Sequence, residues 1–374
     1  MKILFIAPRF HTNQYSLVEK LFKEGHDVKF YVMGIGNSED YRDLTPTLIP
    51  VSLFTKLYLR YFKGRSEIDV FDYTRFALPS FRKYYKEIKA INADKIIVRV
   101  GSYPYFLLLL PLVFLFRKRF LYYSQHPKYQ NVRNWKRQLF NRIVSFNYMV
   151  PWYTPVLHYG NISKNKINNH YLHYIPFFSN SNRSYKDLIS SSNEKVRFLC
   201  VAKYENRKGI ENLISAANLI RNNGYIFSLT IVGSTGNLKR ENYYLKLKAK
   251  VDNLKLNDVI ELEKNVPYFN MGHYYKRNQV FILPSTNEPA SVSQMEAMSY
   301  GLAIICTEDN GTAHYIKHGK NGLVIKPNIK SIEIAMEYYL KSQDILLDHQ
   351  IKSLSIIDHD FSIDNTYKLF MDLL

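Results

Sequence analysis

Short apolar runs alternate with amphipathic segments along almost the whole chain, and this alternation restricts the fold more than any other feature. Continuous runs such as 2–7, 27–32 and 95–100 are typical of strands buried on both faces. Between the first two of these runs, residues 13–24 carry apolar side chains at helical spacing and end at Gly25, which favours a helix with a glycine cap. Strands that alternate with helices predict parallel sheets covered on both faces, so the fold class is α/β.

A polar, low-complexity stretch at 179–193 interrupts this alternation and predicts a domain boundary. After it the pattern restarts, with strands expected at 196–201, 228–232, 259–262, 279–283 and 303–306 and helices at 210–222, 241–254 and 292–299. We therefore predict two Rossmann-like domains facing across a cleft: 1–180, closed by a C-terminal helix at 361–374, a linker at 181–194, and 195–360. Ligands of such sheets bind at the carboxyl ends of the strands.

Positive charge is concentrated in the first half of the chain. The formal net charge is +19, of which residues 1–180 carry +16, and no acidic residue occurs from Lys95 to Lys186. A polycation of this kind predicts a polyanionic partner: a membrane surface, a phosphorylated lipid or a nucleic acid. No RNA- or DNA-binding signature is visible in the sequence, so a nucleic-acid-binding protein is the weaker interpretation and we expect no nucleic-acid partner.

Two segments of this basic half are candidates for contact with a membrane. The apolar run 105–116 is too short to span a bilayer and predicts either a core helix or an interfacial helix with a basic end. Residues 131–147 predict an amphipathic helix in which Trp135 either packs into the core or lies at a headgroup interface. The candidate membrane-contacting cations are Arg117, Lys118, Arg119, Arg133, Lys136 and Arg137.

The cysteine content and the N-terminus indicate a reducing compartment. Cys200 and Cys306 each end a predicted buried strand, which argues against a disulfide framework. The apolar run at the N-terminus is too short for a signal peptide and is better explained as a first strand. We expect a cytoplasmic protein, located peripherally on the inner face of the cell membrane.

The most specific motif lies at 283–301, where Glu288 and Glu296 flank the start of a predicted helix. Residues 289–292 lie at that helix start, and free backbone N–H groups at a helix N-terminus suit a diphosphate. A carboxylate about one turn into the helix can accept hydrogen bonds from ribose hydroxyls, and one just before the helix can reach the hydroxyls of a sugar.

This segment resembles the signature of the retaining family-4 glycosyltransferases of GT-B fold: Pro-Ser, two residues, Glu-Pro, six residues, then Glu-Ala-Met and a glycine. The resemblance extends over about 195–325 and includes 201–209 and the glycine-rich turn at 231–236. It implies that Lys203 and Lys208 bind the donor diphosphate. The family usually has arginine at the position of Lys203, and lysine keeps the charge of arginine but not its forked hydrogen-bond geometry. The resemblance also implies that Glu288 orients the donor sugar and Glu296 holds the ribose. The implied donor-binding residues are Gly233, Ser234, Pro289, Ala290, Ser291, Val292, Ser293 and Glu296.

Other residues match the family less well. His126 follows a predicted strand and resembles the family's histidine near the reacting sugar, or else belongs to an ordinary polar loop. The usual Gly-Gly after the first strand is replaced by residues 8–14. In this segment, Arg9, His11 and Asn13 are candidates for contact with the acceptor or a phosphate. Asn13 is equally suited to cap a helix. His314 stands where the family often has an acid, and with His318 it predicts a surface pair rather than a metal site.

The sequence therefore predicts a metal-independent hexosyltransferase with catalytic candidates His126, Glu288, Lys203 and Lys208. The resemblance implies transfer with retention from a nucleoside-diphosphate sugar, which we expect to be UDP-linked, with no cofactor. The basic half suggests a lipid-linked saccharide acceptor in capsule, O-antigen or teichoic-type synthesis. A sugar-nucleotide 2-epimerase of similar architecture is the alternative, but it would need acid/base carboxylates that the first half lacks over long stretches.

Overall fold

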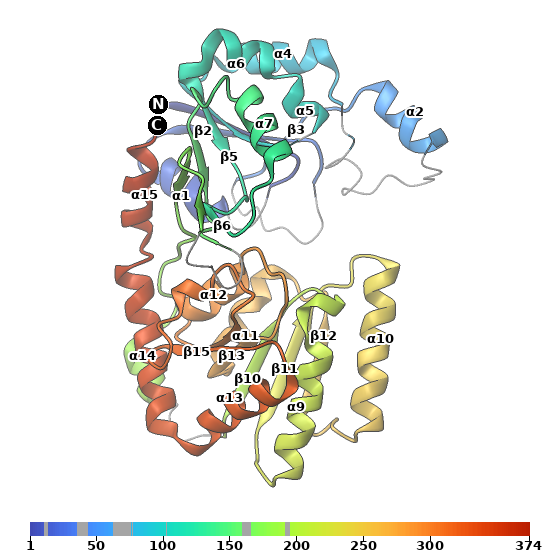
Figure 1. Cartoon of the computed structure of the whole chain (residues 1–374), viewed down its shortest axis with the longest axis vertical. Coiled ribbons are helices and arrows are strands. Elements are labelled where there is room, and N and C mark those ends of the chain that lie inside the picture. The colour runs from blue at the N-terminus through green and yellow to red at the C-terminus, as the bar shows by residue number, and fades with distance from the viewer. Residues whose placement is uncertain are drawn as a thin grey trace. The chain divides into compact units, whose positions relative to one another are not determined.

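The computed structural model describes residues 1–10, 14–35, 44–62, 76, 78–101, 103–158, 166–190 and 195–374. The chain forms two compact units (Figure 1). The first comprises Met1–Pro155, Ile167–Pro176 and Ile363–Leu374, and the second comprises Val156–Lys166 and Phe177–Ser362. Each unit contains one large parallel sheet with helices on both faces, which confirms the predicted α/β class with two Rossmann-like domains.

The sheet of the first unit has the strand order β3-β2-β1-β4-β5-β7-β9, with all neighbours parallel. Its strands are β1 (Lys2–Ala7), β2 (Asp27–Val32), β3 (Thr47–Leu48), β4 (Lys95–Arg99), β5 (Phe120–Tyr123), β7 (Trp152–Thr154) and β9 (Leu172–Tyr174). A separate two-stranded ribbon pairs β6 (Tyr129–Gln130) with β8 (Ile167–Asn168). Sequence periodicity did not predict β7, because a three-residue strand is too short to show a pattern.

Helices cover both faces of this sheet. They are α1 (Tyr15–Lys23), α2 (Leu53–Phe62), α4 (Phe81–Ile91), α5 (Pro104–Leu107), α6 (Leu110–Phe116), the 3₁₀ turn η2 (Arg117–Arg119), α7 (Trp135–Val144) and α15 (Ile363–Met371). One core contains the buried side chains of α4, α5 and α6 together with Trp152 of β7. Successive strand residues point to opposite faces, and the next residue, Tyr153, places its ring 5.6 Å from Phe370 of α15. Helix α15 also binds α1, since Lys20 pairs with Asp364 at 2.8 Å.

The second sheet has the order β12-β11-β10-β13-β14-β15, also with all neighbours parallel. Its strands are β10 (Arg197–Val201), β11 (Ser228–Gly233), β12 (Ile260–Lys264), β13 (Val280–Leu283), β14 (Ala303–Thr307) and β15 (Gly322–Ile325). The helical elements are α8 (Tyr185–Ser190), η3 (Asn206–Lys208), α9 (Ile210–Asn222), α10 (Leu238–Asn253), η4 (Tyr268–Asn270), α11 (Met271–Arg277), α12 (Val292–Ser299), η5 (Ala313–Tyr315), α13 (Ile329–Lys341) and α14 (Gln343–His359). One core packs α9, α10 and α13 on the sheet, and a second core packs α11, α12 and α14 on the other face.

Three expectations about boundaries differ from the structure. The segment expected as a linker contains α8, whose Leu188 is fully buried and which lies against α14. The basic helix expected at 131–147 begins only at Trp135, because the side chain of Asn134 caps it by accepting from the Arg137 amide at 3.0 Å. The single helix considered for 105–116 is two short helices, with a proline in the first turn of each.

Candidate functional site

Backbone contacts join the loops that leave the carboxyl edge of the second sheet. A Cβ added at Gly209, after β10, would lie 2.1 Å from the carbonyl oxygen of Pro284, after β13, and Gly209 has φ +67. A Cβ at Gly233, which ends β11, would lie 2.6 Å from the Ala202 carbonyl oxygen. Only glycine permits such close approach of two backbones, so these residues bring the predicted donor-binding loops together.

Helix α12 begins among these loops. Its cap is Ser291, whose hydroxyl accepts from the Gln294 amide at 3.2 Å and whose own amide donates to Thr312 at 3.3 Å. In the sequence, the backbone amides of Val292 and Ser293 lie between those of Ser291 and Gln294. Because they are in the first turn of the helix, these two N–H groups have no acceptor within it. The Ser293 hydroxyl donates to the Val201 carbonyl at the end of β10, 3.0 Å away. This helix start therefore offers positive dipole and amide donors to an anion.

Buried side chains hold the helix start in place. The Gln294 amide group donates to the Thr312 carbonyl at 2.9 Å and accepts from Asn310 at 2.7 Å. All three residues are fully buried. Because buried polar groups that are fully hydrogen-bonded rigidify their surroundings, the loop after β14 and the start of α12 act as one rigid piece.

Glu288, in the loop after β13, is the centre of an ion-pair network. Lys208 donates to its Oε2, and Arg207 Nη1 donates to the same oxygen at 3.0 Å. The side chains of Lys208 and Glu288 are only 10% and 6% exposed. Arg207 also binds Glu205, which in turn binds Arg240 at the start of α10. The structure thus places the two predicted residues Lys208 and Glu288 in direct contact.

Sequence reasoning missed Arg207 and Arg240. Arg207 directly precedes the predicted Lys208, and this position could have identified it as a site residue. Arg240 is distant in sequence from the predicted residues it joins, so the sequence offered no comparable signal. The predicted Lys203 is half-buried in the same loop as Glu205. Burial opposes ionisation of Glu205, but hydrogen bonds from Arg240 and the charges of Arg240, Arg207 and Lys203 outweigh it and hold the pKa of this carboxyl below its usual range.

Glu296 lies one turn into α12 and is held by two tyrosines. The hydroxyl of Tyr268 donates to Oε1 at 2.9 Å and that of Tyr275 donates to Oε2 at 2.7 Å. Burial raises the pKa of Glu296, and the two tyrosine hydroxyls partly offset that effect. The carboxylate is therefore already a hydrogen-bond acceptor for hydroxyl groups, which is the chemistry expected of a ribose-binding residue. The predicted Ser234 lies in the loop after β11, where its carbonyl accepts from the Tyr204 amide at 3.2 Å.

The N-terminal candidates belong to the first unit. Arg9 is half-buried directly after β1, and the adjacent Phe10 packs its ring 4.7 Å from Phe30. His11 and Asn13 lie outside the described residues. His126 follows β5, where its amide donates to Ser124 at 3.0 Å and its carbonyl accepts from Thr154 at 2.7 Å. Burial, with a contribution from the charge of Arg137, lowers the pKa of His126 to about 4.

His314 does not form the expected surface pair. It is half-buried in η5, with its ring centroid 5.5 Å from that of His158. Burial and the neighbouring His158 lower the pKa of His314 to about 4. Within the described ranges, no three histidine, cysteine or acidic side chains are grouped as metal ligands would be.

We expect acid to destabilise the protein between about pH 6.5 and pH 4, in part through His126. A histidine with a pKa of about 4 when folded and about 6.5 when unfolded binds its proton more readily in the unfolded chain. Stability must therefore fall as the pH drops below about 6.5, by roughly 1 kcal/mol per pH unit for one such group. Thermal unfolding of His126→Gln should show a shallower dependence on pH in this window. An unchanged slope in His126→Gln would contradict the burial of this ring.

The six predicted membrane-contacting cations are all exposed. Arg117, Lys118 and Arg119 form η2, and Lys136 and Arg137 lie in the first turn of α7. Trp135 is 63% exposed, so the alternative that it packs into the core is wrong. In the part of the chain that the structure describes, no helix is both long and apolar enough to cross a membrane.

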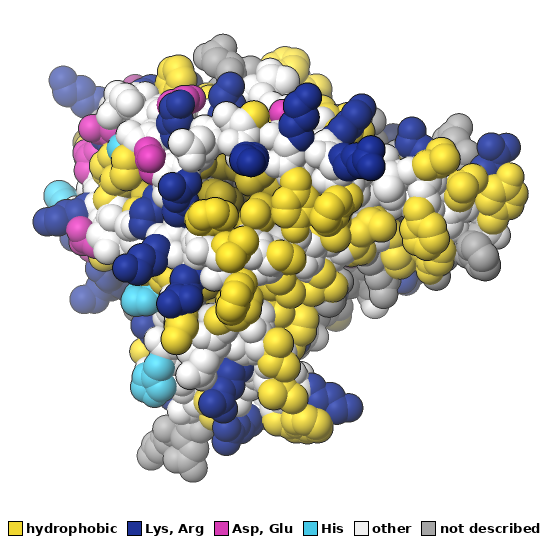
Figure 2. Space-filling view, turned by 90° about the horizontal axis from the view of Figure 1, so that it is seen from above, with side chains coloured by type: hydrophobic (Ala, Val, Ile, Leu, Met, Phe, Trp, Pro, Cys, Tyr) yellow, Lys and Arg dark blue, Asp and Glu magenta, His cyan; other side chains and the backbone are white. Residues whose placement is uncertain are grey.

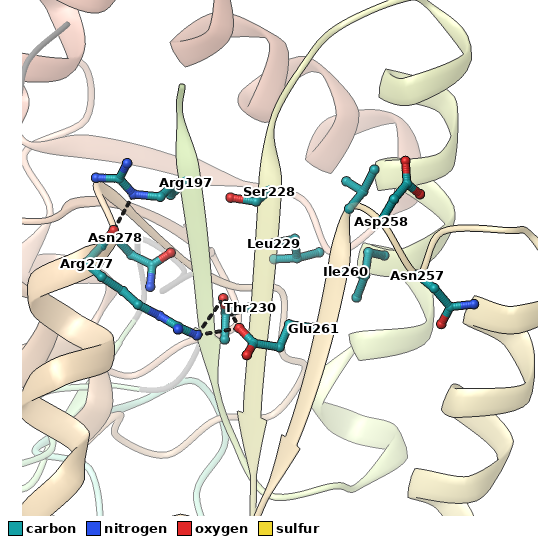
Figure 3. A pocket seen from close by; sticks show the side chains of 11 residues that line it. Arg197, Ser228, Leu229, Thr230, Asn257, Asp258, Ile260, Glu261, Arg277 and Asn278 are labelled. Atoms are coloured by element: carbon teal, nitrogen blue, oxygen red, sulfur yellow. Dashed lines mark hydrogen bonds and ion pairs between the residues drawn. The ribbon is translucent and has the colours of Figure 1, made fainter. Parts of the chain in front are cut away.

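A pocket at the opposite edge of the second sheet contains none of the predicted residues (Figure 3). It lies at the amino ends of β10, β11 and β12, where Arg277 donates to Thr230 at 3.3 Å and pairs with Glu261. Glu261 compensates the charge of Arg277 in this pocket. The carboxyl edge, where the predicted residues lie, remains the candidate functional site of this unit.

Comparison with known proteins identifies the family that the second unit resembles. Residues 184–353 match the family described as glycosyl transferases group 1. A curated relative, the amylovoran biosynthesis glycosyltransferase AmsK of Erwinia amylovora, is 29% identical over 135 residues, which are 34% of this chain and 32% of the relative. The chain thus spans about a third of the length of the curated relatives it matches.

Solved structures cover the whole chain. A glycosyltransferase from Rickettsia africae is 16% identical with a TM-score of 0.73, covering 100% of this chain and 97% of its own. Anabaena HepE in complex with UDP and glucose is 11% identical with a TM-score of 0.72, covering 100% and 98%. Residues 184–353 of this chain thus match the glycosyl transferases group 1 family, and the chain as a whole has the GT-B fold.

Proposed function

We propose that this protein is a glycosyltransferase that moves a sugar from a nucleoside diphosphate to a saccharide acceptor, with retention at the anomeric carbon. The observation that carries the proposal is the contact of Lys208 and Arg207 with Glu288 beside the start of α12. Cations and helix-start amides next to one another suit a leaving diphosphate, whose negative charge grows as the sugar departs.

The ion pairs also suggest how donor binding would prepare the site. Lys208 and Arg207 both donate to the same oxygen of Glu288. A diphosphate that takes these two cations as its counter-ions would free the Glu288 carboxylate for the hydroxyls of the donor sugar. Arg240 would keep Glu205, and through it Arg207, in position. Glu296, with Tyr268 and Tyr275 beside it, would bind the ribose.

A UDP-linked sugar is the donor we propose first, because HepE of the same fold forms complexes with UDP and with UDP-glucose. A thermal-shift screen with UDP-, GDP-, ADP- and CMP-linked sugars tests this directly. We expect the UDP compounds to raise the unfolding temperature most. If none of the nucleotides shifts the transition, the proposed function is wrong.

We propose that leaving-group stabilisation comes from the lysines and amides and requires no metal ion. Activity should therefore be the same with and without EDTA, because Lys203, Lys208 and the amides of Val292 and Ser293 supply the positive charge. The measurement is the rate of nucleotide release in the presence of acceptor after removal of divalent ions. Loss of activity in EDTA that manganese restores would refute this mechanism.

The acceptor is proposed to be a lipid-linked saccharide of a surface polysaccharide such as a capsule, O-antigen or teichoic-type polymer. The name of AmsK, which refers to amylovoran biosynthesis, and the net charge of +16 on residues 1–180 support this assignment. We propose that the enzyme works in the cytoplasm, peripherally on the inner face of the membrane, where anionic lipids attract clustered Lys and Arg. His126 and Arg9 are the proposed contacts for the reacting sugar and the acceptor.

A further inference from the structure

Helices α6 and α7 expose large apolar side chains to solvent. Phe114 and Leu115 of α6 are 59% and 67% exposed, and Trp135 and Ile143 of α7 are 63% and 62% exposed. Phe116 and Leu139 are each 50% exposed. Single exposed apolar residues are ordinary, whereas a group of six on two helices indicates an interaction surface. We call these six residues the apolar face: Phe114, Leu115, Phe116, Trp135, Leu139 and Ile143.

Helix α7 presents its apolar stripe outward. Trp135, Leu139 and Ile143 are spaced four residues apart, so they lie along one side of the helix. On the buried side, the polar Asn141 is 1% exposed and donates to the Tyr171 hydroxyl at 2.9 Å. An amphipathic surface helix normally turns its apolar stripe to the core. Here the stripe remains available for a partner outside the unit.

The two helices form one surface. The ring of Phe114 on α6 lies 5.5 Å from that of Phe146, which directly follows α7. Figure 2 shows apolar side chains gathered in a broad area on the face of the molecule seen from above, with Lys and Arg side chains around it. A continuous apolar area of this kind can be buried as a whole in an apolar environment.

Cations accompany the apolar side chains at short range. Arg119 lies 5.6 Å from the centre of the Phe116 ring, and Lys136 lies 5.7 Å from that of Trp135. No acidic residue occurs between Lys95 and Lys186. A second copy of this chain would bring like charges together across a symmetric contact, which disfavours self-association. Aromatic rings with adjacent Lys and Arg instead match the boundary between anionic headgroups and acyl chains.

We propose that the apolar face inserts into the headgroup region of an anionic bilayer, with η2 and the first turn of α7 binding the lipid phosphates. Helices of seven and ten residues are too short to span the membrane and suit a position in its interface. The inference rests on the proposed function for its biological setting, since a lipid-linked acceptor would be reached from this surface. It adds that apolar insertion, and not charge alone, retains the enzyme at the membrane.

Tryptophan fluorescence of the full chain tests the insertion, because the chain has two tryptophans and the other, Trp152, is fully buried. Vesicles of phosphatidylcholine with phosphatidylglycerol should shift the emission to shorter wavelength, and Trp135→Phe should abolish the shift. Vesicles of phosphatidylcholine alone should give little change. In sedimentation, Leu115→Ser with Ile143→Ser should weaken binding to the anionic vesicles about tenfold or more, the scale for losing two apolar side chains from a lipid phase.

Matched variants separate the contributions of charge and of apolar insertion to vesicle binding. Arg117→Glu with Lys136→Glu should also weaken binding, and added salt should do the same. Ile226→Ser with Leu245→Ser, which changes two exposed apolar residues of the second unit, should bind as wild type. Wild-type binding by the apolar double variant, equal binding to neutral vesicles, or no binding to either kind would overturn the proposal. A fluorescence shift caused by self-association without lipid would overturn it too. UDP binding in solution, measured on the same samples, tests the proposed function separately.

Discussion

Replacing Lys208 with alanine should lower kcat/KM about a hundredfold to a thousandfold, the scale for losing one preorganised donor to a developing negative charge. Lys208 is nearly buried and contacts Glu288, so its ammonium group is held in place before the donor binds. Lys203→Ala should act in the same direction, because Lys203 lies in the same loop. Steady-state kinetics with saturating acceptor measure both effects.

A matched control is available in the same unit. Lys246 forms an exposed pair with Glu211 at 2.8 Å, and exposed pairs contribute little to stability. Lys246→Ala should retain wild-type kinetics and unfolding temperature. If Lys208→Ala is folded by thermal unfolding and yet keeps its kcat/KM, Lys208 does not stabilise the leaving group and the site assignment fails.

Variants of the two motif glutamates should affect different steps. Glu288→Gln should lower kcat about a hundredfold, because the neutral amide binds the sugar hydroxyls less strongly in the transition state. Nucleotide affinity should not fall, because the neutral amide competes less with the diphosphate for Lys208 and Arg207. Glu296→Ala should instead weaken the binding of UDP itself about tenfold or more, the scale for hydrogen bonds to a charged group. Calorimetry with UDP and turnover with the complete donor measure the two quantities independently.

Tyr268→Phe serves as the control for Glu296. It removes a hydroxyl that donates to the carboxylate at 2.9 Å but keeps the carboxylate itself. UDP should therefore bind this variant at least as well as the wild type, since one competing donor is gone. Equal UDP affinity in Glu296→Ala and the wild type, or a loss confined to kcat in that variant, would show that Glu296 does not bind the ribose.

The sequence predicted the second unit better than the first, for a physical reason. Its strands are continuous apolar runs bounded by turn residues, and the motif from Pro284 to Gly301 lies on one strand–loop–helix connection. Such local patterns depend on residues close together in the chain. The pairing of Glu288 with Arg207 joins residues 81 positions apart, and a local sequence pattern cannot predict a contact over that separation.

In the first unit, local patterns were ambiguous. The stripe of Trp135, Leu139 and Ile143 indicated an amphipathic helix, but spacing alone does not say whether the stripe faces a core or the outside. That choice depends on Asn141 and Val144, which occupy the buried side in the structure. The strand β7 was missed because three residues are too few to show a periodic pattern. In the second unit, the helix α8 was missed because it is stabilised by neighbours distant in sequence, as with Leu188 under Gly301.

The return of residues 363–374 to the first unit has a consequence for synthesis on the ribosome. Domains commonly fold in order as they emerge, but here the first unit includes Phe370, which is fully buried and packs on Tyr153. Its residues up to Pro176 therefore emerge long before α15, which packs beside α1 on one face of its sheet. The nascent first half must wait, with that face incomplete, until the entire second unit has been translated. Chaperone dependence during expression, and sensitivity to fusions or truncations at α15, are the expected signs of this delay.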